Sequence, residues 1–155
     1  MSLKIGDQAP DFQLFDSDNN LISLNSFKGK KVVLYFYPKD NTPGCTKEAC
    51  GFRDNWELLS NNNIVVIGIS KDNANSHKKF IEKFSLPFLL LVDEEPCNIA
   101  SSYDSYGLKK FMGREYMGMM RHTFVIDENG KIELIYKKVN TATMAEDIIK
   151  DLNLQ

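Results

Sequence analysis

Two continuous apolar runs mark the centre of the predicted fold. Residues 31–37 and 64–69 consist mainly of β-branched, aliphatic and aromatic residues, which is typical of central strands covered on both faces. Between them, apolar side chains recur at helical spacing and predict a single helix of about 16 residues. Its apolar stripe is formed by Cys45, Ala49, Phe52, Trp56 and Leu59. Residues 31–69 therefore predict a strand–helix–strand crossover, which is nearly always right-handed.

The flanking segments predict further strands and helices. Residues 12–14 and 21–24 flank a run of turn formers, which indicates a β-hairpin near the start of the chain. The later predictions are a helix capped by Asn73 that runs to Phe84, a strand at 88–92, a weak helix at 96–106, a hairpin of strands 122–127 and 131–136 around Asn129-Gly130, and a closing helix at 143–152. This order predicts an α/β protein with a central mixed β-sheet flanked by helices and an N-terminal β-hairpin. A thioredoxin-like fold satisfies it.

Composition and charge narrow the classes of function. A chain of 155 residues without repeats or linkers predicts one domain that spans residues 1–155. The 19 basic and 21 acidic residues are interspersed, so no nucleic-acid partner is expected. The apolar runs are far shorter than the roughly 20 residues of a membrane-spanning helix, so no membrane partner is expected. The first residues contain no apolar signal segment, and we therefore expect a cytoplasmic protein.

Cys45 is the first candidate for chemistry. It follows the carboxyl end of a predicted central strand, where ligands bind in open α/β sheets. Thr42 suits the N-cap position and Pro43 suits the first helical position, which places Cys45 in the first turn. The helix dipole and the unpaired N–H groups of that turn favour a thiolate. The residues alone leave open whether Cys45 is a reactive thiol or an inert apolar one.

Cys50 lies five residues after Cys45 in the same predicted helix. In an intact helix that spacing holds the two Cα atoms about 8.6 Å apart. A disulfide tolerates less than about 7 Å, so these cysteines could bond only if the first turns unwound. The spacing disfavours a disulfide exchanger of the Cys-x-x-Cys type. A small buried apolar role for Cys50 is the alternative.

Four other residues are candidates for a functional site. Arg121 opens a strand, and a guanidinium beside Cys45 would stabilise a thiolate, although a solvated strand end is the simpler interpretation. Alternation places His122 on the opposite face. We expect His77 to be a surface residue of its helix and Cys97 to be a structural or incidental cysteine. A zinc site of Cys45, Cys50, Cys97 and His122 lacks the paired ligand spacings of known zinc sites.

Taken together, the motifs resemble those of the peroxiredoxins, specifically the bacterioferritin-comigratory-protein or Q-type subgroup. The family signature is Pro, three residues, Thr or Ser, two residues and Cys. The matching segments cover nearly the whole chain in order: Pro38, Thr42 and Cys45; Thr42 to Cys50 with Phe52-Arg-Asp54; His77 to Phe80; Leu86 to Phe88; Phe111 to Gly118; and Arg121 to Asp127. Two features depart from the subgroup: the segment at Leu108-Lys-Lys110 is shorter, and His122 replaces a small hydroxyl residue.

The resemblance implies an enzyme and assigns its residues. Cys45 would be the peroxidatic cysteine and Cys50 the resolving one, with Pro38, Thr42 and Arg121 completing the site. The implied activity is reduction of hydrogen peroxide and organic hydroperoxides, through a sulfenic acid that an intramolecular disulfide resolves. A thioredoxin-type dithiol would recycle the enzyme. No cofactor and no metal are implied, and a monomer or weak dimer is expected.

Two functions from other classes remain open from the sequence. A non-catalytic thioredoxin-fold sensor would use the same cysteines and signal by local unfolding. A structural zinc protein is the more remote alternative.

Overall fold

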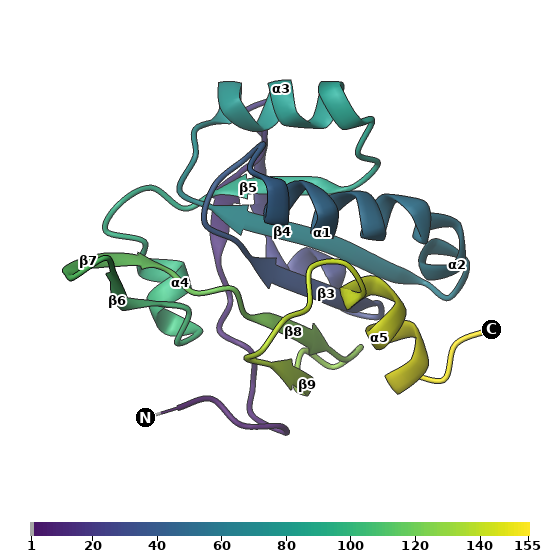
Figure 1. The fold of residues 1–155 in the computed structure, drawn as a ribbon. Coiled ribbons are helices and arrows are strands. Elements are labelled where there is room, and N and C mark those ends of the chain that lie inside the picture. Colours follow the sequence, from purple (N-terminus) through teal and green to yellow (C-terminus); the bar gives the residue numbers. More distant parts are fainter. Residues whose placement is uncertain (1) are drawn as a thin grey trace.

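The computed structural model describes residues 2–155, which form a seven-stranded mixed sheet and a separate two-stranded ladder (Figure 1). The order in the main sheet is β2-β1-β5-β4-β3-β8-β9, and β6 pairs with β7. The strands are β1 (Gln13–Phe15), β2 (Leu21–Ser23), β3 (Lys31–Phe36), β4 (Ile64–Ser70), β5 (Leu89–Val92), β6 (Tyr106–Phe111), β7 (Arg114–Met119), β8 (Thr123–Ile126) and β9 (Ile132–Tyr136). The helices are η1 (Leu24–Phe27), α1 (Pro43–Asp54), α2 (Trp56–Asn61), α3 (Ala74–Phe84), α4 (Asn98–Ser102) and α5 (Met144–Asp151).

Strand β3 lies in the interior of the sheet, between β4 and β8, and its side chains enter two separate cores. It pairs in parallel with β4 and antiparallel with β8, and β4 pairs in parallel with β5. Because side chains alternate along a strand, Tyr35 and Tyr37 face one core while Leu34 and Phe36 face the other. All four are buried, as the continuous apolar run predicts. The predicted parallel crossover from residue 31 to residue 69 is confirmed.

The two faces of the sheet carry different helices. Buried residues of α1, α2, α3 and α5 pack against the core on the Tyr35 face. On the other face, η1, α4 and the N-terminal segment cover the core around Phe36. Figure 1 shows α1 and α5 side by side over the sheet, with the β6–β7 ladder beside α4. Within residues 2–155, none of the helices has the length and apolar character needed to cross a membrane.

Several predicted elements are confirmed. The hairpin at the start is the antiparallel pair β1 and β2, and the second hairpin is the pair β8 and β9. In the turn of the second hairpin, Gly130 has a φ of 81°. The helix predicted at Asn73 begins there, and the Asn73 side chain accepts a hydrogen bond from Ser76 N. The closing helix corresponds to α5.

The prediction of one continuous helix through residues 45–59 is wrong. The chain forms α1 and α2, and Asn55 separates them. The Asn55 side chain donates to the carbonyl oxygen of Gly51 at 2.8 Å, alongside the bond from the main-chain N–H of Asn55 to the same oxygen at 3.2 Å. The apolar stripe continues across the break, because Phe52 and Leu59 both enter the same core.

Two further segments differ from the sequence prediction. The weak helix at 96–106 contracts to α4, at Asn98–Ser102. The β6–β7 hairpin spans residues 106–119, and the sequence predicts no element for residues 107–119. Its two-residue turn, Met112-Gly113, has positive φ at both positions, as a type I′ turn requires. Methionine is rare there, which explains why the usual turn signal was missing.

The prediction that His77 lies on the surface is also wrong. Its side chain is fully buried within α3. His77, Phe80, Ile81 and Phe84 recur at helical spacing, so the imidazole shares the face that α3 turns toward the core. The polar residues around His77 in the sequence concealed that stripe.

Candidate active site

Cys45 lies in the first turn of α1, directly after the central strand β3 and its loop. Thr42 is the N-cap residue and Pro43 the first helical residue, and Thr46 N donates to Thr42 O at 2.8 Å. The amides of Gly44 and Cys45 belong to the turn in which a helix supplies no acceptors for its N–H groups. The Cys45 side chain is 1% exposed. The sulfur therefore sits in a buried place at the positive end of the helix dipole.

Arg121 contacts this sulfur, although it lies far from Cys45 in the sequence. Its Nη2 donates to Cys45 Sγ at 3.3 Å, although the two residues are 76 positions apart. Arg121 lies two residues before β8, which pairs with β3, and Phe36 N donates to His122 O at 2.9 Å. That bond fixes the chain beside Arg121 at the end of β3. The pairing of two strands thus brings the guanidinium to the thiol.

Gly44 lies against the guanidinium of Arg121. A Cβ at position 44 would lie 3.4 Å from Nη2 of Arg121, at the short limit of ordinary van der Waals contact. Glycine at this position leaves the guanidinium room over the first turn of α1.

Glu48 is the second partner of Arg121, and sequence reasoning assigned it no role. Arg121 Nη1 donates to Glu48 Oε1 at 3.1 Å, and Glu48 is 1% exposed. Burial raises the pKa of Glu48 to about 7, against the opposing effect of the Arg121 charge. Its Oε2 is buried and has no hydrogen-bond partner among the described residues. The available signal was spacing: Glu48 follows Cys45 by three residues and so shares its helix face.

The charges around Arg121 hold it as a cation. Burial lowers its pKa, but Coulombic attraction and hydrogen bonds to Cys45 and Glu48 outweigh burial, and the net effect raises the pKa. One guanidinium therefore serves two acidic groups through two different nitrogens. The arrangement can stabilise a negative charge on the sulfur or on an oxygen bound beside it.

Thr42 and Pro38 lie in the loop between β3 and α1. Thr42 occupies the N-cap position as predicted, but its side chain makes no capping hydrogen bond. Instead, Thr42 Oγ1 donates to Lys39 O at 2.8 Å, which tightens the loop and leaves the hydroxyl oxygen free to accept. Pro38 is half-buried, two residues after the end of β3. Their catalytic roles remain predictions.

Cys50 lies further along α1 and is half-buried, and all three cysteines are free thiols. Both Cys45 and Cys50 lie within the intact helix α1. A disulfide between them therefore requires the first turns of α1 to unwind. The roles assigned to these two cysteines remain predictions.

The other candidates lie away from the Cys45 sulfur. Cys97 is fully buried in the core on the opposite face of the sheet, and its Sγ donates to Asp93 O at 3.3 Å. His122 Nδ1 lies 3.2 Å from Ser105 Oγ. Among residues 2–155, no three of Cys45, Cys50, Cys97 and His122 form a cluster able to hold a metal ion. The zinc alternative therefore has no assembled ligand set.

Lys109 of β6 is a further charged group near the site that sequence reasoning missed. Its Nζ donates to Met119 O at 2.9 Å. Burial lowers the pKa of Lys109, as does the positive charge of Arg121, while Cys45 opposes both. The unpredicted β6–β7 hairpin therefore adds a second positive group to the surroundings of Cys45.

Comparison with known proteins agrees with the resemblance inferred from the motifs. The chain is 46% identical over 149 residues to a putative peroxiredoxin bcp of Coxiella burnetii, covering 96% of this chain and 98% of the relative. It is 45% identical over 152 residues to peroxiredoxin Bcp of Bacillus subtilis, covering 98% and 96%. These relatives are of essentially the same length as this chain.

Solved structures agree in fold. A cysteine-to-serine mutant of Xylella fastidiosa PrxQ superposes with a TM-score of 0.91 at 28% identity, covering 99% of this chain and 97% of that one. The bacterioferritin comigratory protein of Xanthomonas campestris, studied for alkyl peroxide reduction, gives a TM-score of 0.88 at 28% identity, covering 97% and 96%. The predicted thioredoxin-like fold is thus confirmed. The family model of the AhpC/TSA family matches residues 5–135, and this chain belongs to that family.

Proposed function

We propose that this protein is a thiol peroxidase that reduces hydrogen peroxide and organic hydroperoxides, with Cys45 as the attacking group. The observation that carries the proposal is the contact between Arg121 Nη2 and Cys45 Sγ, 3.3 Å long, at the start of α1. A cation and a helix N-terminus together stabilise a thiolate, which is the nucleophilic form of cysteine. The similarity to peroxiredoxins over nearly the whole chain supports the same activity.

In the first step, the Cys45 thiolate attacks one oxygen of the peroxide. A sulfur–oxygen bond forms, the oxygen–oxygen bond breaks, and the sulfur becomes a sulfenic acid. The leaving oxygen takes up a proton and departs as water or as an alcohol. Arg121 and the first-turn amides of α1 are placed to stabilise the charge that moves onto that oxygen. The hydroxyl of Thr42 is free to accept a hydrogen bond from the peroxide.

In the second step, Cys50 attacks the sulfenic sulfur and a disulfide forms with loss of water. Because Cys45 and Cys50 both lie within α1, this step requires the first turns of the helix to unwind. A dithiol protein of the thioredoxin type then restores both thiols by exchange. The roles of Cys50, Thr42, Pro38 and Arg121 belong to this proposal, as do the single domain over residues 1–155, the cytoplasmic location and the monomeric or weakly dimeric state.

The test is a coupled assay in which thioredoxin and its reductase supply electrons and peroxide consumption is followed. We expect Cys45→Ser to abolish turnover. Cys50→Ser should lose sustained turnover, because its sulfenic acid has no internal partner and further peroxide oxidises it to sulfinic acid. Cys97→Ser is the matched control, since Cys97 lies in the opposite core, and it should turn over normally.

The products distinguish the alternatives. Peptide mapping of the oxidised wild-type protein should recover a Cys45–Cys50 disulfide. A bond from Cys45 to Cys97, or to a second chain, would refute the assignment of Cys50. Sustained turnover by Cys45→Ser would refute the proposal as a whole, and slow single oxidation without recycling would indicate a sensor instead.

A further inference from the structure

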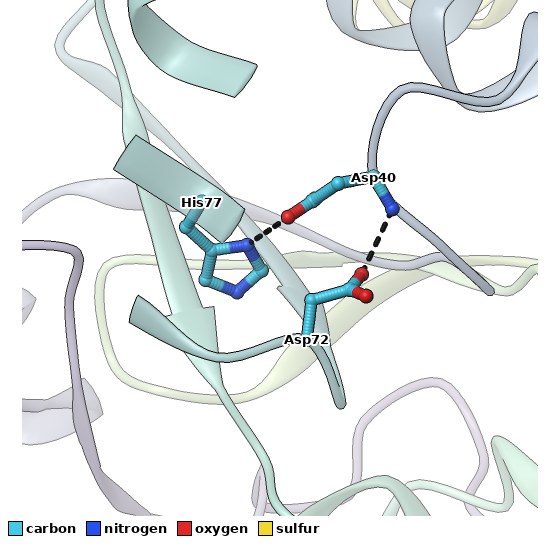
Figure 2. Close-up of side chains that lie close together, drawn as sticks. All are labelled: Asp40, Asp72 and His77. Carbon is cyan, nitrogen blue, oxygen red and sulfur yellow. Dashed lines mark hydrogen bonds and ion pairs between the residues drawn. The ribbon is translucent and has the colours of Figure 1, made fainter. Parts of the chain in front are cut away.

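A second buried polar cluster lies beneath the loop that leads from β3 to α1. Asp40 of this loop is 7% exposed, and its carboxylate meets the fully buried imidazole of His77 in α3. Figure 2 shows the two side chains pointing toward each other, with Asp72 beside them. The distance from His77 Nδ1 to Asp40 Oδ2 is 2.7 Å. None of the steps proposed above uses this cluster.

The hydrogen bonds of His77 show how the pair is held. Its Nε2 lies 2.9 Å from the carbonyl oxygen of Leu91, which can only accept, so Nε2 carries a hydrogen. The remaining hydrogen lies between Nδ1 and the Asp40 carboxyl group. Both ring nitrogens are therefore occupied by protein partners, which leaves His77 no free nitrogen for a metal ion. The pair therefore connects the loop to α3 through two buried side chains.

Further hydrogen bonds hold Asp40 in this position beside α3. Tyr37 donates from its hydroxyl to Asp40 Oδ1 at 2.5 Å, and Ser76 Oγ donates to Asp40 Oδ2 at 2.8 Å. The main-chain N–H of Asp40 donates to Asp72 Oδ2 at 2.8 Å. Asp40 is thus held through both its side chain and its backbone, five residues before Cys45.

We propose that the buried contact between Asp40 and His77 is a latch that sets how often the start of α1 opens for Cys50 to reach Cys45. This inference rests on the proposed function and deepens it. Asp40 and His77 are positioning residues here: they touch neither the sulfur nor the peroxide.

The physical reason lies in where the opening segment is anchored. Residues 41–51 must rearrange for the two sulfurs to meet, and they are held at Asp40 on one side and at the buried Phe52 on the other. With the latch closed, the segment is short and its start is fixed, so Cys45 stays against Arg121. With the latch broken, the loop can move with the helix start, and opening costs less free energy. The latch therefore favours the peroxide-reacting arrangement and slows disulfide formation.

The main test compares wild type with Asp40→Ala/His77→Leu, which removes both partners and leaves neither charge buried alone. Peroxide and Cys50 compete for the Cys45 sulfenic acid, and the peroxide concentration that converts half of Cys45 to sulfinic acid measures this competition by mass spectrometry. We expect the double variant to need about tenfold more peroxide, because breaking a hydrogen bond to a charged group shifts an opening equilibrium by at least that factor. Ser76→Ala removes only a neutral donor to Asp40, and we expect a two- to threefold shift.

Ile126→Val is the control for a general loss of stability. Ile126 is buried in the opposite core, so this variant destabilises the protein without touching the loop. Ile126→Val should leave the half-point unchanged, where the half-point is the peroxide concentration that converts half of Cys45 to sulfinic acid. An unchanged half-point in Asp40→Ala/His77→Leu and in Ser76→Ala would overturn the latch, and so would an equal shift in Ile126→Val.

Hydrogen exchange of the reduced proteins tests the latch without any catalysis. We expect the amides of residues 41–50 to exchange about tenfold faster in the double variant than in wild type. The amides of β4 should not share this tenfold increase. If wild type consumed no peroxide while this exchange difference was present, the proposed function would fail and the latch would stand. If wild type consumed peroxide normally and all variants showed identical hydrogen exchange, the latch would be overturned and the proposed function would stand.

Discussion

Replacing Glu48 with glutamine should change how the stability of the protein depends on pH. Burial raises the pKa of Glu48 from 4.5 to about 7, so the folded protein keeps a proton that the unfolded chain releases. The stabilisation from that proton is fully present below about pH 4.5 and is lost as the pH rises to about 7. At 1.36 kcal/mol per pKa unit, the loss amounts to about 3 kcal/mol. Glutamine stays neutral at every pH and removes this dependence.

The assay is urea unfolding of the reduced protein at several pH values from about 4 to 8, followed by Trp56 fluorescence. The difference in unfolding free energy between Glu48→Gln and wild type should move in favour of the variant by about 3 kcal/mol between the two ends of the titration. Taking the difference cancels the contributions of all other groups. Glu57→Gln, an exposed change in α2, is the matched control and should show no such trend. Parallel curves for Glu48→Gln and wild type would show that Glu48 has no raised pKa in the folded protein.

Three further predictions concern the site and Cys97. Arg121→Met removes the donor at 3.3 Å from Cys45, and stopped-flow measurement should show the peroxide step slowed about 10²-fold. Thr42→Val should slow that step about tenfold or more while Thr42→Ser stays near wild type, since only valine lacks the hydroxyl; equal rates would contradict a role for it. Burial raises the pKa of Cys97 to about 11. Iodoacetamide should therefore alkylate Cys50 in the folded protein and leave Cys97 unmodified, and early labelling of Cys97 by mass spectrometry would contradict its burial.

Local sequence was sufficient for the position of Cys45. Thr42 and Pro43 together with the apolar stripe place the helix start, and the structure has α1 beginning at Pro43. Such signals act within one turn of the chain, so they need no knowledge of distant residues. The same holds for both predicted hairpins, where turn formers lie between alternating segments.

Local signals also failed in identifiable ways. The predicted long helix breaks at Asn55 into two helices, although its apolar stripe continues into the same core on both sides of the break. His77 was expected on the surface because its neighbours in sequence are polar, although its spacing to Phe80 and Phe84 places it on the apolar face. A polar residue on an apolar stripe is buried only if hydrogen-bond partners are present in the core. For His77 these partners are Asp40 and the Leu91 carbonyl, which lie in other elements.

Residues close together in the chain are enough to place a cysteine at the start of a helix behind a central strand, because neighbouring residues dictate helix starts and strand cores. The groups that surround this cysteine come from distant segments, and folding brings them to it. Arg121 reaches Cys45 because β8 pairs with β3, and Glu48 becomes a proton-holding group only once packing buries it. Contacts between residues 76 positions apart, and the loss of water around a carboxyl group, are properties of the packed chain that no local pattern encodes.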